Sequence, residues 1–291
     1  MNKVFSTLVL SLFILTLATA QGKVVEGLSV KSEILGKSVN YAIYLPPDYE
    51  TNQRSYPVVY LLHGYTDNET AWVQFGQIDR LADAAIAEGT IPPMIIVMPD
   101  AGVSYYINNY DNSVRYEDFF IKEFMPHIEK TNRIRQDRRY RGLSGLSMGG
   151  YGALLYAMKY PDLFSATAPL SAAILTEKEV IEDPAEVWAI NEAQLYGNNS
   201  GKDRLTDHWK SYNPMHLAKK IGPDQLKRVR YYFDCGDDDF LYRGNAAIFV
   251  LFRDMGIPSE FRVREGGHNW TYWRTGIIPA LEFIGKSFTQ Y

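Results

Sequence analysis

The pattern of hydrophobic and polar positions along the chain predicts a set of strands. Residues 24–34 and 39–45 alternate between apolar and polar side chains with Gly36-Lys37 between them, which favours an antiparallel hairpin at a sheet edge. Farther along, short runs that are almost wholly apolar are typical of buried strands in a parallel sheet. These runs cover residues 58–62, 94–98, 166–170, 229–233 and 260–264.

Helical periodicity fills the intervals between these strands. It covers residues 78–88, 116–130, 148–159, 245–255 and 277–288. Strand alternating with helix predicts the α/β class, with a mostly parallel central sheet and helices on both of its faces. Since no internal repeat or low-complexity linker is visible, we expect residues 21–291 to form a single domain.

One segment, residues 171–210, departs from this rhythm because it is long, polar and helix-leaning. A segment inserted at such a place can form a lid or a wall of a substrate site, in which case Trp188 or Trp209 would contact substrate. It can equally form surface helices whose tryptophans pack inward. The pattern leaves both interpretations open.

The N-terminal residues predict a signal for export. Lys3 provides a positive charge, residues 4–17 form an apolar run, and Ala18-Thr19-Ala20 has the form of a cleavage site. The apolar run is too short to span a bilayer comfortably, and no cysteine follows the cleavage site to carry a lipid. We therefore predict a signal peptide over residues 1–20 and a periplasmic or secreted protein without a membrane anchor.

Composition narrows the range of partners. The chain has a formal net charge of −4, with 46% hydrophobic and 22% charged residues, as in ordinary globular proteins. This balance gives no electrostatic reason to expect nucleic acid or an anionic membrane surface as a partner. The single cysteine, Cys235, lies at a predicted strand end without metal-ligand spacing, so we expect a buried, inert thiol and neither a disulfide nor a metal site.

The most informative motif is Gly145-Leu146-Ser147-Met148-Gly149, which has the form G-x-S-x-G. Strand-like residues 139–144 precede it and helix-like residues 148–159 follow it, which is the context in which this motif presents a serine as a nucleophile. The turn holds the serine in a strained conformation, and glycines two residues before and after it avoid a collision. We predict that Ser147 is a catalytic nucleophile.

A serine hydroxyl needs a base to remove its proton, and histidine has a suitable pKa. In α/β-hydrolases the chain order is serine, acid, histidine, so the base should lie late in the sequence. Of the five histidines, His268 meets this condition, in a loop between a predicted strand and the last helix. His127 lies within a helical pattern, and His208 and His216 lie in or next to the segment 171–210.

The acid must orient the imidazole and stabilise its positive charge. A cluster of aspartates follows the predicted strand 229–233, which is where this acid is needed. Asp234 belongs to the strand end itself, whereas Asp237, Asp238 and Asp239 follow a glycine. Spacing alone does not choose among these three.

An oxyanion hole needs one amide just after the nucleophile, here that of Met148, and a second from the loop after an early strand. His63-Gly64-Tyr65 follows the apolar run 58–62, so the amide of Tyr65 is the predicted second donor. His63 is then expected to be a structural residue that braces this turn.

Four separated motifs stand out together: Leu62-His63-Gly64, Gly145-Leu146-Ser147-Met148-Gly149-Gly150, Cys235-Gly236-Asp237-Asp238-Asp239 and Gly267-His268-Asn269-Trp270 with Trp273-Arg274. They resemble the esterase D type of α/β-hydrolases, and most of all the feruloyl and acetylxylan esterases of carbohydrate esterase family 1. The resemblance runs from about residue 39 to residue 288 and implies the α/β-hydrolase fold. It implies that Asp239 is the acid, and it agrees with Met148 and Tyr65 as oxyanion donors.

These features together predict a serine carboxylic-ester hydrolase that works through an acyl-enzyme, without a metal or an organic cofactor. The resemblance implies a small or oligosaccharide ester as substrate, with a feruloyl (hydroxycinnamoyl) or acetyl group on plant xylan. Trp188, Trp209 and Trp270 are candidate substrate-binding residues. The alternatives are a periplasmic siderophore esterase, a serine peptidase and a non-catalytic carbohydrate-binding protein on the same fold. The sequence does not predict the oligomeric state.

Overall fold

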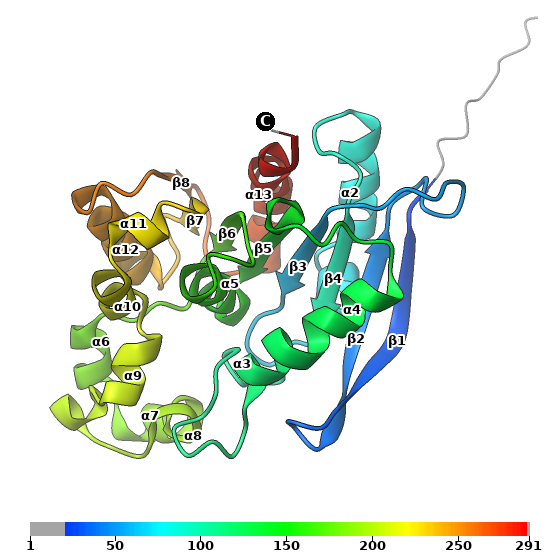
Figure 1. The fold of residues 1–291 in the computed structure, drawn as a ribbon. Helices are drawn as coiled ribbons and strands as arrows, with labels where there is room; N and C mark the ends of the chain where they lie inside the picture. Colours follow the sequence, from blue (N-terminus) through cyan, green and yellow to red (C-terminus); the bar gives the residue numbers. More distant parts are fainter. Residues whose placement is uncertain (1–20, 290–291) are drawn as a thin grey trace, which may run out of the picture.

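The computed structural model describes residues 21–289, and at its centre lies a sheet of eight strands in the order β1-β2-β4-β3-β5-β6-β7-β8 (Figure 1). Strands β3 to β8 run parallel to one another, whereas β2 is antiparallel to both of its neighbours. The predicted α/β class and the edge hairpin are therefore confirmed. The strands are β1 (Lys23–Ser32), β2 (Lys37–Leu45), β3 (Val58–Leu62), β4 (Ile95–Pro99), β5 (Arg141–Leu146), β6 (Ala166–Leu170), β7 (Arg230–Gly236) and β8 (Ser259–Arg264).

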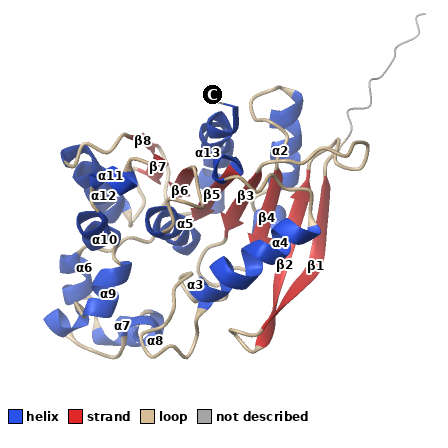
Figure 2. Cartoon of the chain, in the orientation of Figure 1, coloured by secondary structure: helices blue, strands red, loops and turns tan. Residues whose placement is uncertain are grey.

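Two hydrophobic clusters cover the two faces of the sheet, because side chains alternate between faces along a strand. In β3, for example, Val58 and Tyr60 join one cluster and Val59 and Leu61 the other, and all of them are buried. Helices lie against both faces (Figure 2). One face carries η1 (Phe120–Phe124), α4 (Met125–Thr131), α5 (Met148–Lys159) and α12 (Tyr242–Asp254), and the other carries α1 (Ala71–Gln74), α2 (Ile78–Ala87) and α13 (Trp270–Thr289).

The helix predicted over residues 116–130 is not regular. It consists of α3 (Tyr116–Phe119), a π-helical turn that forms η1, and α4. Pro126 near the start of α4 has no amide hydrogen to donate to the preceding turn, which accounts for the interruption. The last helix, in turn, begins at Trp270, seven residues earlier than its apolar pattern indicates.

The segment 171–210 folds into short helices that lie together at one end of the sheet (Figure 1). These are α6 (Glu177–Glu182), α7 (Ala185–Asn191), α8 (Ala193–Tyr196), η3 (Gly201–Arg204) and α9 (Asp207–Tyr212), and α10 (Pro214–Ile221) and α11 (Pro223–Leu226) then lead to β7.

The two tryptophans of this segment pack inward. Trp188 and Trp209 are 1% and 4% exposed, and the indole nitrogen of Trp188 donates to the carbonyl oxygen of Gly197 at 2.9 Å. The guanidinium of Arg204 lies over the Trp188 ring. Each indole therefore fills the interior of the segment, which favours inward packing over the predicted contact of Trp188 or Trp209 with substrate.

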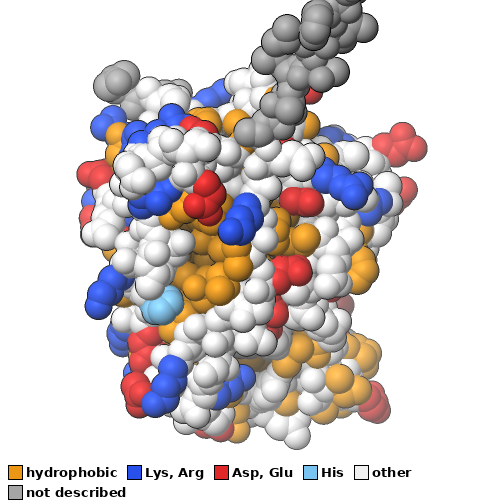
Figure 3. Space-filling model, turned by 90° about the vertical axis from the view of Figure 1, so that its right-hand side faces the viewer, with side chains coloured by type: hydrophobic (Ala, Val, Ile, Leu, Met, Phe, Trp, Pro, Cys, Tyr) orange, Lys and Arg blue, Asp and Glu red, His pale blue; other side chains and the backbone are white. Residues whose placement is uncertain are grey.

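Strand β1 forms one edge of the sheet and carries the exposed charges Lys23, Glu26 and Lys31. A register shift between Val25 and Leu28 also interrupts its pairing with β2, and both features discourage a further strand from adding. The view onto this side shows a shallow apolar hollow bordered by charges of both signs (Figure 3).

Across residues 21–289, no helix combines the length and the apolar character needed to cross a bilayer. The predicted signal peptide, residues 1–20, lies outside the described residues.

Candidate active site

Ser147 stands at the sharp turn between β5 and α5. Its backbone angles are φ 53° and ψ −118°, which a residue with a side chain rarely adopts. The amide of Ser147 donates to the carbonyl oxygen of Leu170 at 3.0 Å, and its own carbonyl accepts from Ala173 at 2.9 Å. These bonds to the last residue of β6 and to the chain after it hold the strained turn, as predicted for a nucleophile elbow.

Glycine is required on both sides of this turn. A methyl group on Gly149 would lie 2.3 Å from the carbonyl oxygen of Leu62, and one on Gly145 would lie 2.6 Å from the carbonyl carbon of Gly149. Since these neighbours are backbone atoms of β3 and of the first turn of α5, they have little freedom to move away. The G-x-S-x-G spacing therefore follows from close packing of the elbow against β3.

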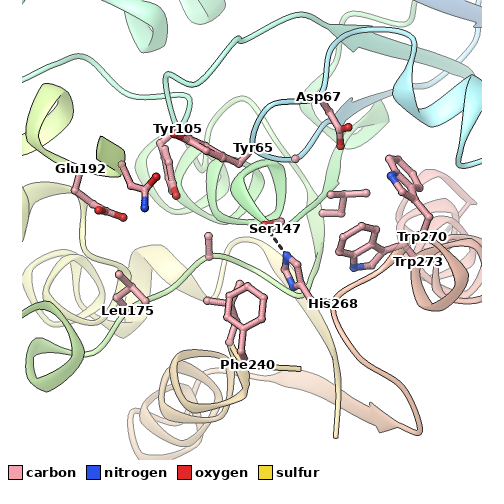
Figure 4. A pocket seen from close by; sticks show the side chains of 15 residues that line it. Tyr65, Asp67, Tyr105, Ser147, Leu175, Glu192, Phe240, His268, Trp270 and Trp273 are labelled. Carbon is pink, nitrogen blue, oxygen red and sulfur yellow. Dashed lines mark hydrogen bonds between the residues drawn. The ribbon is translucent and has the colours of Figure 1, made fainter. Parts of the chain in front are cut away.

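The structure brings Ser147, His268 and Asp239 into contact, although they come from three separate loops (Figure 4 shows the first two). His268 Nε2 lies 2.9 Å from Ser147 Oγ, and His268 Nδ1 lies 3.0 and 3.1 Å from the two carboxylate oxygens of Asp239. The side chain of Asp239 is fully buried, whereas the imidazole keeps 16% exposure. In this arrangement Nδ1–H donates to the carboxylate, which leaves Nε2 free to accept the serine proton.

Asp239 is held as a carboxylate by its neighbours. Burial by itself raises its pKa, but hydrogen bonds from His268, Ser171 and the Leu241 amide outweigh burial and lower the pKa below the usual value. Trp273 donates its indole N–H to Ser171 Oγ at 3.1 Å, which orients that hydroxyl toward the acid. Sequence reasoning missed Ser171, whose unusual φ of 46° only the folded chain reveals.

The neighbouring aspartates have other roles. Asp237 accepts from the amide of Gly266 at 2.9 Å and so ties its own turn to the loop that carries His268. Asp238 is exposed. Asp234 is fully buried and pairs with Arg264 at 2.9 Å and with the Tyr272 hydroxyl at 2.6 Å, which fixes the start of α13.

The loop after β3 lies against the nucleophile. A methyl group built on Gly64 would lie 3.7 Å from Ser147 Cβ, so the backbone of this loop passes beside the serine. Met148 is the first residue of α5, and its amide therefore has no carbonyl partner within the helix. The two predicted oxyanion donors, the amides of Met148 and Tyr65, thus belong to segments that meet at Ser147.

His63 braces this loop, as predicted. Its Nδ1 donates to the carbonyl oxygen of Gly64 at 2.7 Å, and its Nε2 accepts from the amide of Ala101 at 2.8 Å. Tyr106 donates its hydroxyl to the His63 carbonyl at 3.1 Å. With both ring nitrogens occupied and 1% exposure, His63 is a structural residue.

The other histidines have partners away from Ser147. His127 packs its ring against Tyr41, His216 contacts the Glu177 carboxylate at 2.6 Å, and His208 lies against Tyr212. Within residues 21–289, His, Cys, Asp and Glu side chains form no group of three that could hold a metal ion.

A cavity of about 480 Å³ opens around Ser147 and His268 (Figure 4). Two groups of residues line it on opposite sides of the serine. We call one side the tryptophan arm, formed by Asp67, Trp270 and Trp273, and the other the glutamate arm, formed by Tyr105, Leu175, Asn191 and Glu192. Trp270 therefore lines the cavity, and the segment 171–210 supplies a wall through residues other than its tryptophans.

Comparison with known proteins places the chain in a family. The family described as "Putative esterase" matches residues 32–284. The chain belongs to this esterase family. The esterase is 27% identical over 267 residues to the acetyl esterase of Caldicellulosiruptor saccharolyticus, a match that covers 88% of this chain and 96% of that protein.

Two further relatives carry feruloyl esterase names. The esterase is 34% identical over 164 residues to an endo-1,4-beta-xylanase/feruloyl esterase of Xylanibacter ruminicola, which is 54% of this chain and 22% of that protein. A solved ferulic acid esterase structure is 34% identical with a TM-score of 0.79, covering 92% of this chain and 99% of that one. These matches confirm the α/β-hydrolase fold, the resemblance to carbohydrate esterase family 1 and the assignment as a serine hydrolase.

Proposed function

We propose that Ser147, His268 and Asp239 form the catalytic triad of this esterase. The observation that carries the proposal is the 2.9 Å contact between Ser147 Oγ and His268 Nε2, with the buried carboxylate of Asp239 behind the ring. That geometry lets the imidazole take the serine proton and lets the carboxylate stabilise the resulting charge.

In the first half-reaction, Ser147 Oγ attacks the ester carbonyl carbon and its proton moves to His268 Nε2. The carbonyl oxygen becomes an oxyanion, which the amides of Met148 and Tyr65 stabilise by hydrogen bonds. When the tetrahedral intermediate collapses, the bond to the alcohol oxygen breaks and His268 returns the proton to that oxygen. The acyl group remains on Ser147 as an ester.

In the second half-reaction, water replaces the alcohol. His268 removes a proton from the water as its oxygen attacks the acyl carbon, and the same two amides hold the oxyanion. Collapse breaks the bond to Ser147 Oγ, His268 returns the proton to the serine, and the carboxylic acid leaves. No step requires a group beyond the side chains and amides named here and water.

We further propose that the substrate is a feruloyl or acetyl ester on plant xylan. The names of the relatives support the two acyl groups, and the aromatic lining of the cavity by Tyr105, Trp270 and Trp273 suits a flat acyl group or a sugar. Trp270, in this view, contacts the substrate on the tryptophan arm.

A substrate panel tests this function with wild type and Ser147→Ala. Wild type should hydrolyse 4-nitrophenyl acetate, methyl ferulate and acetylated xylan, and the variant should lose these activities. Equal rates for the two proteins would exclude the triad. Preferential cleavage of a ferric siderophore ester or of a peptide amide would instead assign the enzyme to one of those classes, and sugar binding without hydrolysis would indicate a binding protein.

We also propose that residues 1–20 direct export and are removed. The mass of the protein recovered from the cell exterior or periplasm tests this, since cleavage after Ala20 leaves Gln21 as the first residue. Recovery of the uncleaved chain from the cytoplasm would contradict it.

A further inference from the structure

Glu192 is the unusual group in the cavity. It is 9% exposed, it lines the cavity that contains Ser147, and no described residue gives its Oε2 a hydrogen bond. A buried carboxyl oxygen without a partner costs free energy, which a structural role would have to offset through other contacts. The carboxyl group instead points into the cavity from the side opposite Trp270 (Figure 4).

The surroundings of Glu192 favour its neutral form. Burial raises its pKa to about 7, Asp183 adds to the rise, and the charge of Arg204 opposes it. Arg204 does not neutralise the carboxylate by direct contact, because its guanidinium donates to the carbonyl oxygens of Asn199, Val180 and Asp183. Near neutral pH the carboxyl group can therefore both donate and accept a hydrogen bond.

The glutamate arm is lined by an aromatic ring and an aliphatic side chain before it reaches Glu192. Tyr105 and Leu175 line it between Ser147 and Glu192. Glu192 also borders a smaller cavity of about 30 Å³, which Tyr151, Trp188 and Trp209 line among others. A ligand that enters the arm from Ser147 therefore meets Leu175 and the ring of Tyr105, and then the polar side chains of Asn191 and Glu192.

The position of His268 indicates which half of the ester enters this arm. His268 gives its proton to the leaving alcohol, so the alcohol must lie on the side of that imidazole. The imidazole of His268 contacts two rings of the cavity wall, that of Phe240 with centroids 4.5 Å apart and that of Trp273 with centroids 4.9 Å apart, and both lie away from Glu192 (Figure 4). The acyl group then extends in the other direction, toward Glu192.

We propose that Glu192 determines acyl specificity by hydrogen-bonding a hydroxyl group at the far end of an aromatic acyl group. This inference rests on the proposed ester hydrolysis at Ser147 and narrows its substrate class to hydroxylated aromatic esters. A substrate hydroxyl would give this carboxyl group a hydrogen-bond partner from within the cavity.

The test compares methyl 4-hydroxycinnamate with methyl cinnamate, which differ only in the acyl hydroxyl. Wild type should prefer the hydroxylated ester by about fivefold to tenfold in kcat/KM, mainly through KM, as one net hydrogen bond allows. Glu192→Leu should abolish the preference, and Glu192→Gln should retain most of it because an amide also donates and accepts. Glu186→Gln is the matched control, since Glu186 is exposed on the same segment, and it should leave the preference as in wild type.

Three results would overturn the inference. Wild type could show no preference for the hydroxylated ester, or Glu192→Leu could keep the wild-type preference. The third is a change in kcat/KM on Glu192→Leu that depends on the alcohol of the ester when the acyl group is the same. If Glu192→Leu does not fold, Glu192→Ala carries the same comparison. Hydrolysis of 4-nitrophenyl acetate by wild type and Ser147→Ala is measured in parallel. Equal rates for these two proteins would refute the proposed function. If Ser147→Ala is inactive but Glu192→Leu keeps the wild-type preference, only the role of Glu192 is refuted.

Discussion

Replacing Asp239 with asparagine tests the electrostatic part of the site. The carboxylate accepts from His268 Nδ1 at 3.0 and 3.1 Å and from the Leu241 amide at 2.9 Å. An asparagine of the same shape exchanges one acceptor oxygen for an NH₂ donor and removes the charge. The amide favours the imidazole tautomer in which Nε2 carries the proton, and that tautomer cannot accept the proton of Ser147.

The size of the expected loss in kcat follows from the removed negative charge and from the changed tautomer of His268. Two opposite unit charges about 4 Å apart attract by about 4 kcal/mol at an effective dielectric constant of about 20, which corresponds to about a thousandfold in rate. The tautomer change adds to this, and triads whose acid becomes an amide lose about 10⁴-fold in kcat. We therefore expect Asp239→Asn to lower kcat by about 10³-fold to 10⁴-fold.

The assay is steady-state hydrolysis of 4-nitrophenyl acetate by Asp237→Asn, Asp238→Asn and Asp239→Asn. Asp238 is exposed, and an asparagine at position 237 still offers an oxygen to the Gly266 amide, so both controls should stay within about tenfold of wild type. A severe loss in Asp238→Asn, or a loss of less than tenfold in Asp239→Asn, would refute the assignment of the acid.

Four further predictions concern the packing of the protein and the residues around the active site. Gly149→Ala should lower the free energy of unfolding by at least about 1–3 kcal/mol in denaturant titration, because its methyl group would lie 2.3 Å from a backbone oxygen of β3. Trp188→Ala should cost about 3–5 kcal/mol in the same titration, whereas an unchanged stability with a raised KM would favour substrate contact. Ser171→Ala should lower kcat by about threefold to tenfold at unchanged KM, since it removes one hydrogen bond to the acid, and Ser171→Thr should restore part of the rate. Glu192→Gln should raise the melting temperature at pH 8 and have little effect at pH 4. The pKa of the folded carboxyl is raised to about 7 and that of the unfolded one is near 4.5, so wild type loses up to about 3 kcal/mol between these pH values, and an equal effect at both would contradict the raised pKa.

The parts of the site that follow local rules could be predicted from the sequence. The elbow at Ser147 depends on glycine spacing and on a strand and helix that flank it, and all of these are visible in a short stretch of chain. His268 could also be predicted, because the base follows the serine and the acid in the order of the chain. The acid required more, because which of Asp237, Asp238 and Asp239 faces the imidazole depends on the turn after β7.

The segment 171–210 shows why the remainder could not be predicted. Its polar pattern is equally compatible with a solvent face and with a cavity wall, and only tertiary packing places Trp188 inside and Glu192 on the cavity. Ser171 has no sequence signal either, since its role depends on a backbone angle and on the indole of Trp273. In the helix after residue 116, by contrast, Pro126 was a visible sign of the interruption.

Mass analysis of the acyl-enzyme tests the central claim most directly. Wild type and Ser147→Ala are mixed with 4-nitrophenyl acetate, quenched in acid within the first turnover and digested. Wild type should carry one acetyl group per chain on the peptide that contains Ser147, and the variant should carry none there while losing hydrolysis. An acetyl group that persists elsewhere in Ser147→Ala together with wild-type turnover would contradict the account.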